Sequence, residues 1–507
     1  MKLYTDKMYF KIKILIFLLS IYSFSQDKVI IKQSDFLQNY SENNTNFDMF
    51  CGNVIALYKD HKLYCDTIFI SKDGKYIRAG SKKYSTIKDN EGSRIQSRKI
   101  EFLKNDSIIN FIDQVIFKKK ENKIKTNFLI YNPEKKTVYY KNGGEILDQE
   151  NTITSLNGIY HINDEFGQFS ENVKIKTNNY IIESNNIDLD NKNDIIFLNN
   201  RSIIKSDSLI IEGDQGFINK SKESINLWSN TSIKSKERKV FSDSLSINES
   251  NETQLSGNTE IHQKENLKIY CQKYIEKEGL SKFNGKPFII FSSEKGDLKI
   301  EGNKMKMVHS DSILHIYNNT YISSDSIQGK CDDSTFDFKS ELVTMLNKPV
   351  LWTENDQITG DTIYIHIEGE TLDSIYIPSN SFIISKEKNN LFNQIKGNEL
   401  EGKFKKGNLN KLKLFSNTEL KYFEFEENNE LSGLNDIISS YIIINFKENE
   451  ISNISFLNKP QATYLPKKLF TEKAMLLEGF IDRFNEKKYW IIINKLSLQI
   501  YLNLQYK

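Results

Sequence analysis

Alanine is almost missing from this chain of 507 residues, where it occurs as Ala56, Ala79, Ala462 and Ala474. Because alanine is the best helix former, its scarcity argues against a helical protein. The 4 cysteines are too few for a disulfide scaffold. An excess of one charge is also lacking, since the net charge is +2. That balance excludes a bulk electrostatic attraction to nucleic acid or to anionic membranes.

Common catalytic and metal-binding motifs are absent from the sequence as well. No GxSxG, P-loop, GxGxxG or CxxC motif occurs, and the 6 histidines show no zinc-ligand spacing. We therefore expect no enzyme activity, no metal site and no cofactor, and we expect the histidines at the surface or at a rim. Aspartates such as Asp207, Asp243 and Asp361 begin strand-like segments. We expect these aspartates to form hydrogen bonds with turn backbone, because they recur at the same position of the repeat. The alternative is that they line the groove of a glycosidase.

Strand-forming residues are what the sequence has in plenty. Aromatic residues make up 12% of the chain, more than a disordered chain would contain. Isoleucine, tyrosine, phenylalanine, threonine and serine are all frequent, which favours β-strands. Core packing is the expected role of the three tryptophans, Trp228, Trp352 and Trp490.

The N-terminus has the pattern of a secretory signal peptide. Lys7, Lys11 and Lys13 flank the start of an apolar run at residues 12–24, and small residues precede Gln26. We predict a signal peptide at residues 1–25, either Met1 or Met8 as the start, and export to the periplasm. The run is short for a membrane span, and an uncleaved anchor is the alternative.

A first short motif recurs along the chain and predicts a turn or bulge at the entry to a strand. It combines Asn or Gly with a β-branched or aromatic run. Pro287, Pro349 and Pro460 occupy one position of it, and proline is tolerated at strand starts but not in strand centres. Its copies begin at Gly52, Asn172, Asn230, Gly257, Gly285, Asn319, Asn347, Asn417 and Asn458.

A second motif lies between these marks and consists of Asp, a small polar residue and alternating apolar residues. Alternation with period two places the apolar side chains on one face of a strand. Cys65, Cys271 and Cys331 share one strand position and are expected to be small buried side chains, although a Cys51–Cys65 disulfide is an alternative. The interior residues that the motif predicts are Ile68, Ile70, Leu209, Ile211, Leu245, Ile247, Ile363 and Ile365.

The two motifs together define a repeat of about 30 residues that holds two strands. The interval from Asp243 to Gln272 equals that from Asp332 to Asp361. A period of this size indicates a stacked array, whereas a propeller blade needs four strands in a longer repeat. We predict an all-β, elongated antiparallel stack of repeated strand pairs, with a right-handed β-helix as an alternative.

The motif pair resembles the OstA-like branch of the LptA/LptC/LptD-N-terminal superfamily of Gram-negative envelope proteins. The resemblance spans about residues 48–466 and is weakest at residues 75–165. Its nearest local matches are Lys348–Trp352, Gln357–Ile363, Phe392–Gly397, Gly402–Phe404, Gly433–Asn435, Ile454–Phe456 and Lys459–Pro466.

This resemblance implies a β-taco, or β-jellyroll, with acyl chains lodged between its two sheets. It also implies transport of lipopolysaccharide, through its lipid A part, toward the outer membrane, without catalysis. The eight interior residues would then line the lipid groove. Partners would be other Lpt-type folds that pair with exposed edge strands near residues 30–70 and 440–466.

The predicted organisation is a signal peptide, an N-terminal module at residues 26–170, further repeats at residues 171–466 and a tail at residues 467–507. The tail holds a helix-like stretch around residues 469–477 and is an alternative cap for the second edge. Two other functions stay open: a structural or adhesive surface solenoid, and a polysaccharide-acting β-helix enzyme.

Overall fold

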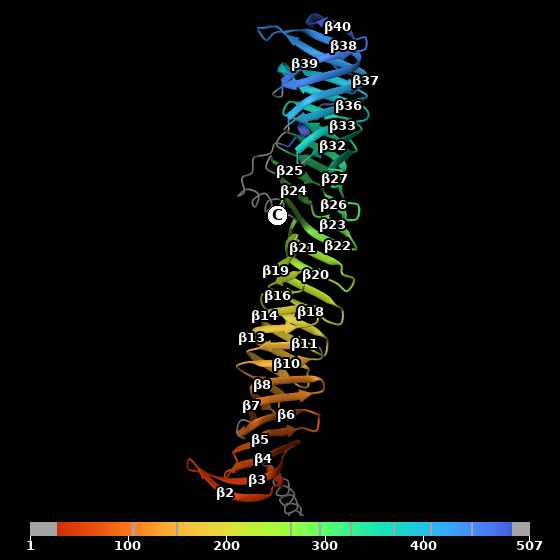
Figure 1. Cartoon of the computed structure of the whole chain (residues 1–507). Coiled ribbons are helices and arrows are strands. Elements are labelled where there is room, and N and C mark those ends of the chain that lie inside the picture. Colours follow the sequence, from red (N-terminus) through yellow and green to blue (C-terminus); the bar gives the residue numbers. More distant parts are fainter. Residues whose placement is uncertain are drawn as a thin grey trace, which may run out of the picture. The chain divides into compact units, whose positions relative to one another are not determined.

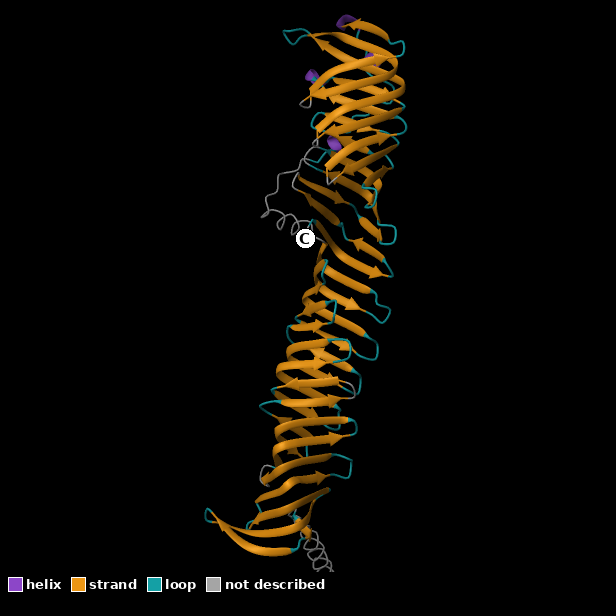
Figure 2. Ribbon diagram, in the orientation of Figure 1, coloured by secondary structure: helices purple, strands orange, loops and turns teal. Residues whose placement is uncertain are grey.

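The computed structural model describes residues 28–103, 107–148, 151–263, 266–293, 296–324, 327–368, 371–405, 408–447 and 450–488. The predicted signal peptide and Trp490 therefore lie outside the described residues. Strands account for 72% of the chain, and all strand pairs are antiparallel (Figure 2). The all-β antiparallel prediction is confirmed.

The chain divides into unit 1, residues 1–223, and unit 2, residues 224–507. Unit 1 contains eighteen described strands, most of which are labelled in Figure 1. They are β1 (Ile30–Gln33), β2 (Phe36–Glu42), β3 (Thr45–Tyr58), β4 (His61–Ser71), β5 (Tyr76–Lys88), β6 (Arg94–Leu103), β7 (Ile108–Lys119), β8 (Asn122–Asn132), β9 (Thr137–Tyr140), β10 (Gly144–Asp148), β11 (Asn151–Ser155), β12 (Asn157–His161), β13 (Phe166–Lys176), β14 (Ile181–Asp190), β15 (Ile195–Leu198), β16 (Ser202–Lys205), β17 (Ile210–Gly213) and β18 (Gln215–Asn219).

Unit 2 contains the later strands and a few helical turns. They are β19 (Ser224–Lys234), β20 (Arg238–Ile247), β21 (Thr253–Gln263), β22 (Leu267–Lys277), β23 (Leu280–Asn284), β24 (Phe288–Ser293), β25 (Gly296–Glu301), β26 (Lys304–Val308), β27 (Ile313–Ser323), β28 (Gln328–Asp337), β29 (Leu342–Leu346), β30 (Val350–Trp352), β31 (Asp356–Thr359), β32 (Thr362–Glu368), β33 (Thr371–Ile377), β34 (Ser381–Lys386), η2 (Lys388–Asn390), β35 (Phe392–Gly397), β36 (Glu399–Lys405), β37 (Asn408–Phe425), β38 (Leu431–Lys447), β39 (Glu450–Leu457), β40 (Gln461–Pro466), η3 (Lys467–Leu469), α2 (Glu472–Met475) and η4 (Phe484–Glu486).

Each unit consists of two facing sheets, because the long strands bend in the middle and contribute one half to each sheet. In unit 1, β13 pairs with β12 before its bend and with β11 after it. We call the sheet that contains β2, β9 and β12 sheet I, and the sheet that contains β1, β10 and β11 sheet II. In unit 2, β23, β26 and β29 belong to sheet I, whereas β24, β30 and β31 belong to sheet II.

The bends are β-bulges at the copies of the first sequence motif. In β13 the register shifts between Ser170 and Val173, and Glu171 and Asn172 have φ values of 65° and 55°. Asn318 and Asn319 form a similar left-handed pair in β27. Two residues in this conformation turn the chain from one sheet into the other, and Asn tolerates it better than most residues. The predicted turn or bulge is confirmed.

The aspartates of the second motif hold these corners together. Oδ2 of Asp243 accepts a hydrogen bond of 3.1 Å from the backbone N–H of Asn258, at the next corner. Oδ2 of Asp66 accepts one of 2.8 Å from the N–H of Lys82. Asp66 and Asp243 therefore bind turn backbone at exposed corners, as the favoured interpretation predicted. Oδ2 of Asp361 instead accepts from the side chains of Ser379 and Asn380, both at 2.8 Å, and Asp361 borders a pocket beside residues 478–486.

The core of each unit lies between its two sheets, where inward side chains alternate with outward ones. Cys65, Cys271 and Cys331 are buried there, as predicted, each directly before the corner of its strand. Cys51 is a free thiol, as is Cys65, so the structure contains no bond between them. Trp352 is fully buried, but its burial comes from a cluster with Leu477 and Phe484 near the end of the described chain. Trp228 is 41% exposed, which contradicts its predicted core position.

Candidate functional site

A small apolar cavity of about 40 Å³ lies between the two sheets near the start of unit 1. Two of the chain's four alanines, Ala56 and Ala79, face this cavity, one from each sheet. Their small side chains leave space that Ile or Leu would fill elsewhere in the core. The lining residues are Val29, Ala56, Leu57, Tyr58, His61, Leu63, Ile68, Ile77, Ala79, Ile87, Ile100, Phe102 and Ile109.

Most of the eight predicted interior residues do lie between the sheets. Ile68 is fully buried and lines the cavity. Ile211, Leu245, Ile363 and Ile365 are also buried, in other parts of the two units. The eight residues are thus spread along the stack, and one of them reaches this cavity. Whether any of them contacts lipid stays a prediction.

Three of the eight are less buried than expected. Ile70 and Ile247 are half-buried, and Leu209 is 37% exposed. Leu209 precedes β17 and lies in a turn in which its carbonyl accepts a hydrogen bond of 2.9 Å from the N–H of Ser206. The alternation of β17 starts only at Ile210, so the interior prediction for Leu209 is wrong.

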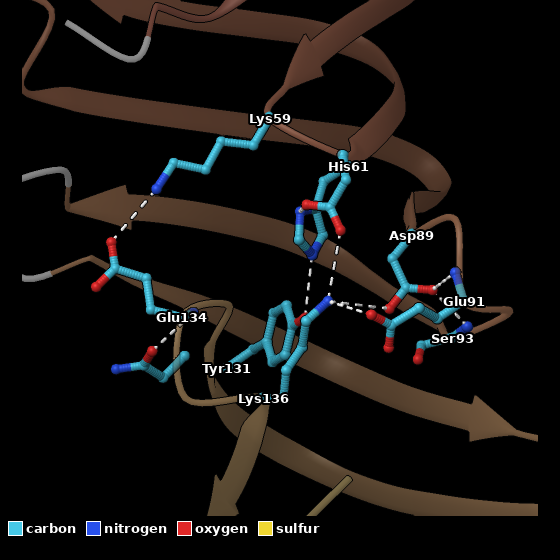
Figure 3. Close-up of polar contacts among 10 residues, drawn as sticks. Lys59, His61, Asp89, Glu91, Ser93, Tyr131, Glu134 and Lys136 are labelled. Atoms are coloured by element: carbon cyan, nitrogen blue, oxygen red, sulfur yellow. Dashed lines mark hydrogen bonds and ion pairs between the residues drawn. The ribbon is translucent and has the colours of Figure 1, made fainter. Parts of the chain in front are cut away.

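Hairpins of the two sheets meet opposite the corners, and we call this line the mouth. Near the cavity, Lys136 of sheet I reaches three carboxylates on hairpins of sheet II (Figure 3). Its Nζ atom lies 3.4 Å from Oδ2 of Asp60, 3.4 Å from Oε1 of Glu91 and 4.0 Å from Oδ2 of Asp89. Burial opposes the charge, but the carboxylates of Asp60 and Glu91 prevail and raise the pKa of Lys136.

Two further contacts join the sheets at the same place. The Nζ atom of Lys59 lies 3.3 Å from Oε1 of Glu134, and Nε2 of His61 lies 3.0 Å from the hydroxyl oxygen of Tyr131 (Figure 3). His61 lies at this rim, one of the two positions expected for the histidines, but it is buried, with 4% exposure, and is not at the surface. Its burial lowers the pKa of its imidazole, which keeps the ring neutral near pH 7.

Similar contacts cross the mouth of unit 1 farther along the chain. Lys120 of sheet II pairs with Glu165 of sheet I at 2.5 Å, and Asp148 of sheet II lies 3.7 Å from Lys220 of sheet I. Sequence reasoning missed this row, since its members are far apart in the chain. The charged residues at the hairpin tips indicate that ion pairs could form there. Which residues pair can be predicted only when the strand register of both sheets is known.

The site offers shape and apolar surface rather than reactive groups. The described residues include no group of three or more His, Cys, Asp or Glu side chains placed to hold a metal ion. No helix in the described part of the chain is long and apolar enough to cross a membrane. An apolar cavity under a polar rim binds ligands by burying hydrocarbon, and such cavities suit small apolar groups and acyl chains.

The terminal strands leave unpaired edges that carry apolar side chains. In unit 1, Ile30 of β1 is 51% exposed, and Phe36 and Leu37 of β2 are exposed as well. In unit 2, Ile451 of β39 and Tyr464 of β40 are exposed. Exposed strand edges are ready templates for pairing with another chain.

Two family models match the chain. Residues 26–185 match the OstA-like protein family, and residues 239–371 match the LptA/(LptD N-terminal domain) LPS transport protein family. Together the two matches cover more than half of the chain. The first includes residues 75–165, where the sequence motifs are weakest.

One similar solved structure is that of LptH, the LptA-homologous periplasmic component of the lipopolysaccharide transport device of Pseudomonas aeruginosa. It is 14% identical, with a TM-score of 0.20, and the match covers 22% of this chain and 81% of LptH. No curated protein is significantly similar in sequence. The family matches and the two-sheet architecture of repeated, corner-bent strands agree, and the chain is therefore an OstA-like member of the LPS transport protein family.

Proposed function

We propose that this protein binds the acyl chains of lipopolysaccharide between its sheets and carries the lipid through the periplasm toward the outer membrane. The observation that carries this proposal is the apolar cavity of unit 1, lined by both sheets and rimmed by charged residues. Each buried CH₂ group contributes about 0.8 kcal/mol, so an acyl chain that parts the two sheets at this cavity would be held without any reactive group.

The exposed edges support a role as one part of a longer bridge. Apolar side chains such as Phe36 in β2 and Tyr464 in β40 are exposed on the terminal strands. Backbone pairing at these edges would join the chain to other Lpt-type β-jellyroll proteins. The transport itself would need no catalysis, because lipid moves between grooves of similar polarity.

The test is lipid analysis of the intact protein purified from the periplasm, by mass spectrometry, followed by binding of added lipopolysaccharide. A cavity-filling variant, Ala79→Leu, should reduce binding at least fivefold, because the new side chain occupies the space of an acyl chain. Ala462→Leu is the matched control, since Ala462 is exposed on β40 and should leave binding unchanged.

Absence of lipid A species, together with no binding of added lipopolysaccharide, would contradict the proposal. That result would favour the structural surface solenoid, which shares the repeat but needs no ligand. Equal losses in the two alanine variants would also contradict the assignment of the cavity as the binding site.

A further inference from the structure

The end of the described chain does not cover the edge strand β40, which was one predicted role for the tail. Residues 470–488, which we call the strap, instead run back across the strands of sheet II in unit 2. The contacts follow in order: Phe470 packs on Phe423 of β37, Leu477 binds Gln394 of β35, and Lys488 reaches Glu301 of β25.

The strap lies on the outer face of sheet II, away from sheet I. The register places Trp352 opposite Gln357, Gln357 opposite Ile384, and Ile384 opposite Gln394, so these four share one face. Leu351 is on the other face, beside Gly329. A Cβ atom added to Gly329 would meet Leu351 and also Met345 of sheet I, so that face is the interior.

Two buried glutamines hold the backbone of the strap. The Gln394 amide donates to the carbonyl of Met475 at 2.9 Å and accepts from the N–H of Leu477 at 2.8 Å. The Gln357 amide donates to the carbonyl of Ile481 at 2.8 Å and accepts from the N–H of Arg483 at 2.7 Å. Each carboxamide thus pairs with the strap as a peptide group in a neighbouring strand would.

Within the sheet, the Gln394 side chain also donates to the carbonyl of Phe392 at 3.1 Å, while its oxygen accepts from the strap. Gln357 is 1% exposed and Gln394 is 0% exposed, and a buried carboxamide without partners is destabilising. Their backbone partners on the strap satisfy both ends of each amide. A carboxamide that pairs with C=O of residue i and N–H of residue i+2 recognises peptide backbone whatever its side chains.

Side-chain pockets add selectivity to this backbone recognition. Leu477 and Phe484 are buried in one cluster, together with Trp352 and Phe382 of the sheet, and Phe480 packs against the cluster. The Nζ atom of Lys386 lies 4.1 Å from the ring centre of Phe484. Aromatic and aliphatic side chains inserted into a preformed apolar surface are the usual anchors of peptide binding.

Charged contacts fix the far end of the strap. Oε2 of Glu486 lies 2.7 Å from Nζ of Lys330, on β28. Nζ of Lys488 lies 2.7 Å from Oε2 of Glu301, and the N–H of Lys488 donates to the hydroxyl of Tyr321 at 2.7 Å. The strap is therefore positioned by its backbone, by its apolar side chains and by its charges.

We propose that the outer face of sheet II in unit 2 is a binding site for a polypeptide segment with short helical turns such as α2 and η4, and that residues 470–488 are the ligand it holds in the resting chain. The ligand class has apolar residues at the spacing of Leu477, Phe480 and Phe484, with an acidic residue two positions later. Release of the strap opens the site to the same segment supplied by another molecule. The site is separate from the cavity of unit 1 and does not depend on lipid binding.

Trp352 reports on the site, because it is fully buried in the cluster that the strap completes. The chain has 3 tryptophans, and replacing Trp228 and Trp490 with Phe leaves Trp352 as the only one. In this full-length background, Leu477→Ser with Phe484→Ser removes the two buried anchors of the strap and leaves the sheet unchanged. We expect acrylamide to quench Trp352 at least threefold more strongly in this variant, with the β-sheet circular dichroism retained.

A synthetic peptide of residues 470–488 should bind the anchor variant and return quenching to the wild-type level. The same peptide with Ser at position 484 should not bind, nor should the native peptide bind the wild-type chain, whose site is occupied. Adding Gln357→Ala to the anchor variant should weaken peptide binding at least tenfold.

Unchanged shielding of Trp352 in the anchor variant, or failure of the native peptide to restore it, would overturn the proposal. A second measurement covers the case in which the anchor variant does not fold. In the wild-type chain, the amides of Leu477 and Arg483 should exchange hydrogen together and faster than those of β31 and β35. Exchange of all these amides at one common rate would mean that the strap never leaves the sheet, which also contradicts a reversible site.

Discussion

Lys136 and Asp60 belong to different sheets of unit 1, and the Nζ atom of one lies 3.4 Å from Oδ2 of the other. Together with Lys59–Glu134 and His61–Tyr131, this pair joins the sheets directly beside the apolar cavity. An acyl chain that enters sideways must part these contacts. Their energies are modest, since partly exposed ion pairs typically contribute less than 1 kcal/mol each, so the closure is reversible.

The mouth therefore predicts a reversible block of lipid uptake. In a Cys51→Ser background, Lys59→Cys with Glu134→Cys places one thiol on each side of the mouth. A bis-methanethiosulfonate reagent that joins them should reduce lipopolysaccharide binding at least tenfold, and reductant should restore it. Binding is measured by native mass spectrometry before and after reduction.

The matched control joins two strands of one sheet. Lys125 of β8 and Glu145 of β10 face each other within sheet II, with Nζ 3.1 Å from Oε2. Lys125→Cys with Glu145→Cys should crosslink with no effect on lipid binding. Full binding with the mouth crosslinked would mean that lipid enters from an end of the stack.

His61 predicts a loss of stability in mildly acidic solution. Burial lowers the pKa of His61 below its ordinary value of 6.5, so the unfolded chain takes up this proton more readily than the folded chain. The neutral His61 side chain contributes fully to the free energy of unfolding above pH 6.5. This contribution is lost as the pH falls below 6.5, where the unfolded chain is protonated first. Urea unfolding at pH 7.5 and pH 5.0 measures the difference.

His61→Gln is the control for this effect, because a glutamine can still bind the hydroxyl of Tyr131 but does not titrate. The variant should lose less stability between the two pH values than the wild-type chain. Identical pH dependence in both chains would show that other groups cause the acid sensitivity.

The sequence was sufficient for the strand face at the second residue after Asp243 and after Asp361, the corner aspartates. Leu245 and Ile363 are buried for this reason, as the alternation predicted. Leu209 departs from the pattern because a turn delays the start of β17. Local pattern fixes which residues alternate, but the turn that precedes a strand decides where the alternation begins.

Features that depend on distant residues could not be predicted in the same way. The asparagine motif located the corners, yet the division of each long strand between two sheets depends on the register. The cavity depends on the small side chains of Ala56 and Ala79, which meet only across the two sheets. Trp228 is exposed and Trp352 is buried, although both are tryptophans of strands, because the strap covers only the second.

The two faces of a strand should respond differently to a charge. Leu245→Asp and Ile363→Asp bury a carboxylate between the sheets and should each cost more than about 3 kcal/mol of unfolding free energy, with loss of lipid binding. Ser246→Asp and Thr362→Asp on the opposite face should change it by less than about 0.5 kcal/mol. Urea unfolding of the four variants measures this, and equal costs on both faces would contradict the assigned alternation.

Glu486 makes the attachment of the strap sensitive to acid. Hydrogen bonds from Arg483, with the nearby charge of Lys330, outweigh burial and lower the pKa of Glu486 from 4.5 to about 2. A lowered carboxyl pKa stabilises the docked strap above pH 4.5, and this stabilisation is lost as the pH falls from about 4.5 to about 2. Quenching of Trp352 by acrylamide should therefore rise across this interval in the chain that retains Trp352 as its only tryptophan. Glu486→Gln has no charge to lose, so its quenching should be higher at pH 7 and should change less on acidification. If both chains respond alike while the β-sheet circular dichroism is constant, the contact between Glu486 and Lys330 does not hold the strap.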